Sequence, residues 1–183
     1  MPKVSDEHRA GRRQQILDAA AACFARDGFH KTSMQDIVSA SGVSAGLVYR
    51  YFAGKDDIIA AIVSAWHEQR SAAIADDPAQ AYLTLLRSVG DPDARESLQV
   101  GVQTWAEAVR SPRIREVVRD GVDGPRRAAA AFLTQQAPDI DADALARVLI
   151  AIYQGLLLQT VWDPAVDNAA YVAAVESLLA RLR

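Results

Sequence analysis

Apolar residues recur at helical spacing along almost the whole chain, and this pattern constrains the fold more than any other feature. Ala, Leu, Arg, Gln and Glu dominate, whereas the alternation typical of strands is scarce. Turn signals that contain Gly or Pro separate the periodic segments. The sequence therefore predicts an all-α fold of about nine helices. The first four begin near residues 11, 33, 44 and 55, and the later ones lie near 79–89, 93–110, 113–135, 141–162 and 168–182. We expect Gly121 and Gly124–Pro125 to kink or split the 113–135 segment.

Composition indicates a globular protein of a reducing compartment. Half of the 183 residues are hydrophobic, which is enough for a buried core in one or two domains. Cys23 is the only cysteine, so an internal disulfide and a cysteine-based zinc cluster are excluded. No charged-then-apolar leader opens the sequence, and charged or amide residues break its apolar runs before they reach the length of a bilayer span. We expect a cytoplasmic protein that does not enter a membrane.

Charge is distributed unevenly. Residues 1–55 hold eight Lys or Arg against five Asp or Glu, and residues 56–183 hold twelve against eighteen, which together give the net charge of −3. A small basic head therefore precedes a larger acidic body. A basic head suits an anionic partner, although its excess is modest.

Residues 33–52 read as two short helices joined by a tight turn. Ser33 and Asp36 have the spacing of a capping box, and Ser44 can cap the next helix. Gly42 lies between them and can adopt positive φ at no steric cost. This is the pattern of a helix-turn-helix, whose second helix enters a DNA major groove.

The stretch from Arg13 to Ile59 resembles the DNA-binding domain of the TetR (tetracycline-repressor-like) family of bacterial transcriptional regulators. The matching pieces are ILDAAAACFARDGFHKTSMQDIVSASGVS and GLVYRYFAGKDDII. The resemblance implies a DNA-binding domain over residues 1–54 and a helical ligand-binding and dimerisation domain over 55–183. It also implies a repressor that releases a palindromic operator when a small molecule binds the body.

Matching positions assign candidate DNA contacts. The N-terminus of the recognition helix would meet base edges, and hydroxyl and ammonium groups around it would meet phosphates. Two residues depart from the family pattern. Ala45 stands where many relatives carry a longer polar side chain, and Gly54 replaces the usual serine cap of the fourth helix. The residues implied are Ser44, Ala45, Gly46 and Arg50 for bases, and Thr32 or Ser33, Tyr49 and Lys55 for phosphates.

The body carries aromatic and amide residues suited to a small-molecule cavity. For each aromatic taken singly, ordinary core packing is the commoner role. Trp105 and Gln103 are the preferred ligand contacts, because their helix is expected between the helix that bears the head and the last two helices. The candidate ligand residues are Trp66, Gln103, Trp105, Phe132, Tyr153 and Gln154.

Two long apolar helices close the chain and can form a four-helix bundle with a second copy. Part of each apolar stripe must face the core of its own chain. The candidate interface residues are Leu145, Leu149, Ile152, Leu156, Tyr171, Val175, Leu178 and Leu179.

An enzyme and a scaffold are the competing functions. The three histidines lie far apart in the sequence, and neither HExxH nor GxSxG occurs, so we expect no catalysis and no cofactor. A helical dimer that binds a ligand but not DNA remains the alternative, supported by Ala45 and by the acidic total charge.

Overall fold

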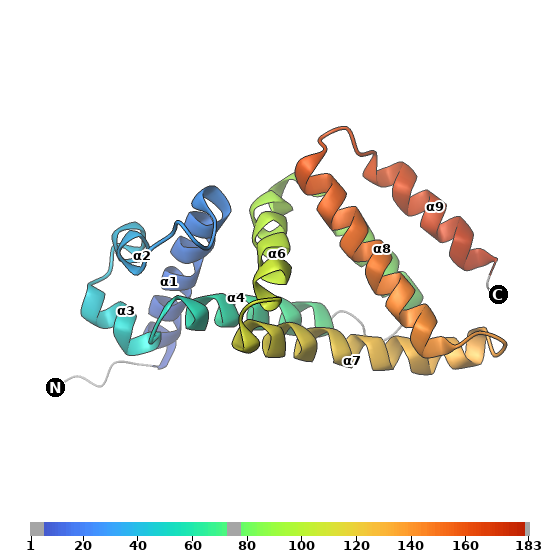
Figure 1. The fold of residues 1–183 in the computed structure, drawn as a ribbon, viewed down its shortest axis with the longest axis horizontal. Helices are drawn as coiled ribbons and strands as arrows, with labels where there is room; N and C mark the ends of the chain where they lie inside the picture. The colour runs from blue at the N-terminus through green and yellow to red at the C-terminus, as the bar shows by residue number, and fades with distance from the viewer. Residues whose placement is uncertain (1–5, 73–77, 182–183) are drawn as a thin grey trace.

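The structure of the chain is a computed structural model that describes residues 6–72 and 78–181. Its described part is helical, as expected, with nine α-helices, one short 3₁₀ segment and no strand (Figure 1). The elements are α1 (Asp6–Asp27), α2 (Met34–Ser41), α3 (Ala45–Tyr51), α4 (Lys55–Ala72), α5 (Pro78–Ser88), η1 (Pro92–Ala94), α6 (Arg95–Ala108), α7 (Pro112–Gln136), α8 (Ala142–Trp162) and α9 (Asn168–Ala180).

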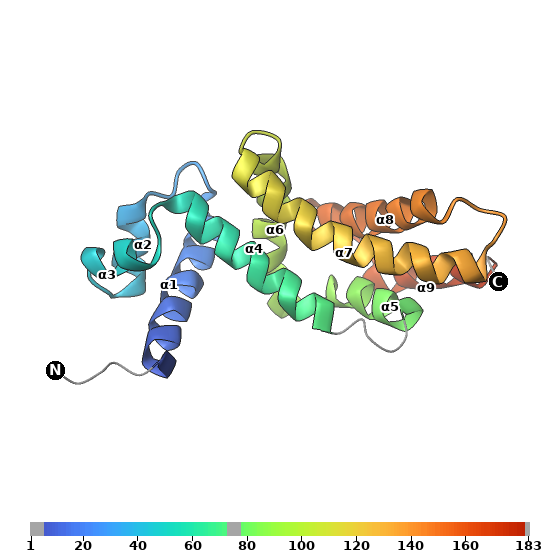
Figure 2. The ribbon, with the colours of Figure 1, turned by 90° about the horizontal axis from the view of Figure 1, so that it is seen from below.

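Helices α1 to α3 gather at one end of the molecule, and α8 and α9 lie at the other (Figure 1). Helix α4 leaves the head and runs into the body, where it lies along α7 (Figure 2). Helix α6 stands between the two ends and contacts both α1 and α8. Helices α4 and α6 are therefore both in position to connect the head to the body.

The predicted caps at the helix-turn-helix are confirmed. Ser33 Oγ accepts from the Asp36 N–H at 3.2 Å, and the Ser33 N–H donates to the Asp36 carboxylate at 2.8 Å. The Ser33 hydroxyl and amide hold the pKa of Asp36 below its ordinary value, because both stabilise the ionised carboxylate. Gly42 has φ of +66°, and Gly28, which ends α1, has φ of +83°. The two left-handed glycines directly follow the last residues of α1 and α2 and end those helices.

Two apolar cores share helix α6. The head core joins Ile16, Phe24 and Ile37 to Ile58 of α4 and Val100 of α6. The body core packs α5, α6, α8 and α9 against one another, with members that include Leu83, Leu86, Leu98, Leu156 and Val175. Because α6 supplies residues to both cores, a movement of α6 would change the packing of the head core and of the body core.

Helix α7 corrects the expectation of a split helix. It runs unbroken from Pro112 to Gln136 with Pro125 inside it. Contacts with α4 and α8 hold this helix, and Arg126 forms ion pairs with Asp123 and with Asp143 of α8. Gly121 serves a close approach instead of a bend, since a Cβ there would overlap the ring of His67 on α4.

Candidate nucleic-acid interface and ligand cavity

Helix α3 presents to solvent most of the residues expected to meet DNA. Ser44, Ala45, Gly46, Tyr49 and Arg50 are all exposed, and the Tyr49 side chain is 54% accessible. The opposite side of the helix carries Val48, which is fully buried in the head core. The short helix therefore has one anchored face and one free face with a hydroxyl, a phenol and a guanidinium.

The anchored face is fixed from both ends. The Gln15 amide of α1 donates to the carbonyl of Ser41 at 2.7 Å, which ties α1 to the end of α2. Phe52, which closes α3, is buried, and the guanidinium of Arg13 lies 5.4 Å from the centre of its ring. These contacts orient α3 relative to α1 before any ligand arrives.

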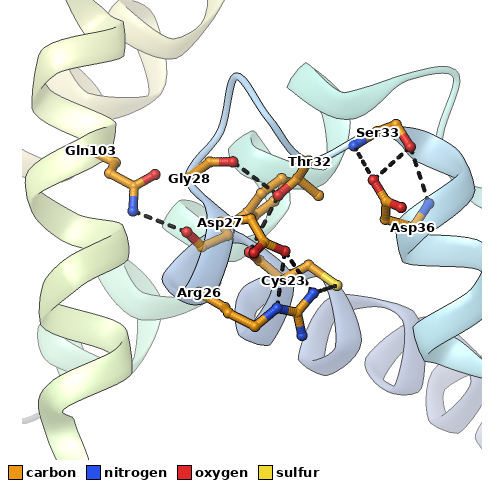
Figure 3. A network of polar contacts seen from close by, with 9 residues as sticks. Cys23, Arg26, Asp27, Gly28, Thr32, Ser33, Asp36 and Gln103 are labelled. Atoms are coloured by element: carbon orange, nitrogen blue, oxygen red, sulfur yellow. Dashed lines mark hydrogen bonds and ion pairs between the residues drawn. The ribbon is translucent and has the colours of Figure 1, made fainter.

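The structure places the two hydroxyls expected at the start of α2 in different environments. It corrects the expectation that Thr32 could contact a phosphate. Thr32 is 1% exposed, and its hydroxyl donates to the carbonyls of Gly28 at 2.9 Å and Cys23 at 3.2 Å (Figure 3). This side chain satisfies carbonyls at the end of α1 and cannot also reach a phosphate. Ser33 is exposed at the N-cap of α2, where helix N–H groups favour an anion.

Lys55 is half-buried and holds the α1–α2 loop, residues 28–32. Its ammonium donates to the carbonyl of Phe29 and, at 3.1 Å, to that of Thr32. An ammonium has three donors, so one remains beyond these two bonds. Its contact with a phosphate stays a prediction, while its bonds to the loop are part of the fold.

A cavity of about 450 Å³ lies in the body between α4, α5, α6, α7 and α8. Trp66, Trp105 and Tyr153 line it, as the sequence predicts, and the rings of Trp105 and Tyr153 meet edge to face with centroids 6.5 Å apart. Asp91, next to η1, is the one acidic residue of the lining, and no Lys or Arg belongs to it among the described residues.

Three candidate ligand residues lie elsewhere. Phe132 and Gln154 are half-buried and do not line this cavity. Gln103 points away from it, toward the end of α1 (Figure 3). Residues two apart on a helix point about 200° apart, so Gln103 and Trp105 cannot face the same space. Helical periodicity could have found the missed lining residue Gly101, one turn before Trp105.

The candidate interface residues on α8 and α9 differ in how far they are exposed. Leu156 and Val175 are buried in the chain's own core, which removes them from any surface between copies. Leu178 is 56% exposed, while five others are half-buried. Those five are Leu145, Leu149, Ile152, Tyr171 and Leu179.

The outer face of α8 is apolar. It exposes Val148, Leu158 and Trp162, which share a side of α8 at helical spacing. Helix α8 is also the one helix of residues 6–72 and 78–181 long and apolar enough to cross a membrane by length and composition. Core helices of soluble proteins share this length and composition.

Comparison with known proteins gives matches over both parts of the chain. Residues 16–62 match the model of the bacterial regulatory proteins of the tetR family. Residues 75–183 match the C-terminal model of BetI-type transcriptional repressors. An HTH-type transcriptional repressor of Mycobacterium tuberculosis is 41% identical over 75 residues, which are 41% of this chain and 40% of that protein's length.

Solved structures show the same fold over nearly the whole chain. A transcriptional regulator from Saccharomonospora viridis in complex with choline is similar with a TM-score of 0.77 and 24% identity, over 93% of this chain and 96% of its own. GusR of Salmonella enterica is similar with a TM-score of 0.79 and 22% identity, over 99% and 98%.

Proposed function

Because this chain belongs to the TetR family of bacterial regulatory proteins, we propose that it is a ligand-released repressor that binds a palindromic operator as a homodimer in the cytoplasm. It is a DNA-binding transcriptional regulator of the helix-turn-helix type. We assign residues 1–54 to DNA binding and 55–183 to ligand binding and dimerisation, with α4 packed into the core of the head and α6 supplying residues to both cores. The protein acts by binding and not by catalysis.

The free face of α3 carries the DNA proposal. Tyr49 and Arg50 lie exposed in the last turn of the helix, and Ser44 lies exposed at its N-cap, while Val48 anchors the helix in the head core. Phenol and guanidinium groups donate to phosphates and base edges, and Ser33 adds the N-terminus of α2. Alanine cannot form a bidentate hydrogen bond with a base, so Ala45 contributes at most an apolar contact to a thymine methyl.

A gel shift with a palindrome-containing fragment from beside the protein's own gene tests this proposal. Arg50→Ala should lower specific affinity by about 1–3 kcal/mol and relax sequence preference if it meets a base edge. Arg127→Ala removes the same charge from an exposed site on α7 and should leave affinity within twofold or so of the parent, since Arg127 lies in the body. Absence of any shift at low salt would favour the ligand-binding scaffold without DNA binding.

A second copy is the proposed cover for the outer face of α8 and α9. Val148, Leu158 and Trp162 on α8 and Leu178 on α9 are large apolar side chains in contact with water. An apolar surface of this kind marks an interface, and twofold symmetry would double the number of reading heads. Leu178→Glu should convert a dimer into a monomer in sedimentation, whereas Gln135→Glu on α7 should not. Unchanged mass for Leu178→Glu would reject this face.

The cavity is the proposed effector site, and organic cations are the first class to examine. Trp66, Trp105 and Tyr153 supply aromatic surface, and Asp91 is the one acidic residue of the lining. Aromatic faces attract quaternary ammonium groups. The similar S. viridis regulator holds choline in its crystal structure, which makes choline the natural probe here.

Thermal shift distinguishes this ligand class from a general apolar one. Choline at about 100 times its dissociation constant should stabilise the fold by about 2.7 kcal/mol, and it should lower affinity for the operator. The neutral isostere 3,3-dimethylbutanol should stabilise it far less, because it lacks the charge. Trp105→Ala should abolish the choline effect. Equal stabilisation by both compounds would make the site apolar instead of cation-selective.

A further inference from the structure

The side chain of Gln103 bridges the body and the DNA-binding head with both ends of its amide. Its Nε2 donates to the carbonyl of Phe24 at 3.0 Å, which is the dashed line at Gln103 in Figure 3. Its Oε1 accepts from the N–H of Phe29 at 2.9 Å. Phe24 lies in the last turn of α1, and Phe29 begins the α1–α2 loop after Gly28. An amide with one donor and one acceptor engaged fixes both distance and orientation.

Gly28 makes this contact possible. Its φ of +83° ends α1 and turns the next N–H outward, and a Cβ at Gly28 would lie 3.6 Å from Gln103 Oε1. Phe29 itself is buried, with its ring edge against Phe24 at a centroid distance of 4.9 Å. The hydrogen bond that the Phe29 N–H donates to Gln103 therefore joins α6 to a part of the loop that is anchored in the head core.

The loop passes directly to the surface proposed to meet DNA. Thr32 follows three residues after Phe29, and its hydroxyl donates to carbonyls at the end of α1 and the start of the loop. The Lys55 ammonium donates to the carbonyls of Phe29 and Thr32 in the same loop. Ser33 follows as the N-cap of α2. A shift of the Phe29 backbone is thus passed to the start of α2 through bonded neighbours.

Helix α6 offers its other side to the cavity. Gly101 and Trp105 line the cavity, whereas Gln103, about 200° away from each, faces the head. Val100 and Leu98 of the same helix belong to the head core and the body core respectively. A ligand that presses on α6 must therefore displace Gln103 as well.

We propose that Gln103 is the positioning residue that couples the cavity to the head, because it ties α6 to the α1–α2 loop and hence to the N-cap of α2. Helix α4 is then not the sole connection. This inference rests on the proposed function, since it assigns a route by which an occupied cavity changes the DNA-binding surface.

A cavity-filling variant can stand in for the unidentified effector. A Cβ at Gly101 would meet only Leu157 Cδ1, at 3.9 Å, so Gly101→Phe can place its ring in the cavity. Gly101→Ala changes helix propensity similarly without filling the space. Gly101→Leu is the smaller filler if the phenylalanine variant does not fold.

Amide hydrogen exchange in the free protein gives a readout that does not depend on DNA. Gln103→Leu should speed exchange of the Phe29 N–H by about fivefold, as loss of one hydrogen bond implies. Gln103→Glu keeps the acceptor for that N–H but loses the donor to the Phe24 carbonyl, so it should lose less of this protection than Gln103→Leu does. Gln99→Leu removes the same type of amide one turn earlier on α6 and should leave Phe29 unchanged.

The coupling itself is tested by combining the two sites. Gly101→Phe should alter exchange of the loop amides by at least about fivefold in the parent and in Gln99→Leu, but by less than about twofold in Gln103→Leu. Equal changes in all three backgrounds, or no change in any, would overturn the proposal.

DNA binding of the same variants separates this inference from the proposed function. Coupled exchange in a chain that binds no DNA would retain Gln103 as the link and reject the repressor. DNA binding with loop exchange indifferent to Gly101→Phe would retain the regulator and reject the link.

Discussion

Gly121→Ala tests the closest approach between α4 and α7. A methyl group at this position would overlap the imidazole of His67, so either the ring or the helix pair must move. Overpacking of a well-filled site costs about 1–3 kcal/mol, and alanine returns about 1 kcal/mol of helix propensity relative to glycine. Because the methyl would occupy the volume of the ring itself, we expect an overpacking cost at the upper end of that range, about 2–3 kcal/mol, which leaves a net loss of about 1–2 kcal/mol.

Thermal unfolding followed by circular dichroism measures this loss, at one protein concentration because dimerisation couples to Tm. At about 2–4 °C per kcal/mol for a chain of this length, Tm should fall by about 2–8 °C. Gly11→Ala is the matched control, since nothing lies within 4 Å of a Cβ there. It should raise Tm by about 2–4 °C through helix propensity alone.

The two glycines should therefore respond with opposite signs. Removing the ring with His67→Ala should abolish the penalty, so that Gly121→Ala becomes neutral or stabilising in that background. A rise in Tm for Gly121→Ala in the parent chain, or an equal fall with and without the His67 ring, would refute the steric argument.

Further predictions concern the polar contacts of the head and body. The lowered pKa of Asp36 means that its capping contribution is present above the ordinary value of 3.8 and lost as pH falls through the lowered value; Asp36→Asn should therefore reduce stability at pH 7 and flatten its acid dependence. Lys55→Ala should lower stability by about 1–3 kcal/mol by unpairing two loop carbonyls, and it should also weaken DNA binding at low salt. Tyr82→Phe should cost about 0.5–1.5 kcal/mol, because the phenol donates to the carbonyl of Leu149 at 2.8 Å; an unchanged urea midpoint would contradict this.

Local sequence signals predicted the head well because its structure is set by local rules. The capping box at Ser33 and the left-handed turn at Gly42 each depend on neighbours in sequence. Thr32 and Ser33 were indistinguishable in sequence, since both are hydroxyls before a helix. Contacts with the end of α1 turned one inward and left the other exposed.

Predicting the site residues of the body required knowing which side of each helix packs against which neighbour. Composition does not carry that information. Leu156 and Leu158 are equally apolar, yet one is buried in the chain and the other is exposed. Gln103 and Trp105 were assigned to one cavity although helical geometry separates them, an error that periodicity alone would have prevented. Gly121 could not be recognised as a packing glycine without the position of α4.

The salt dependence of operator affinity tests the central claim most directly. If each of two heads brings Arg50 to a base edge in the groove and Lys55 to a phosphate, about four cations displace condensed counterions, and log K should fall with log salt with a slope of about −4. Arg50→Ala should reduce the steepness by about two units, because both heads lose a charge. Affinity that does not vary with salt, or no binding at low salt, would contradict the assignment of the α3 surface to DNA.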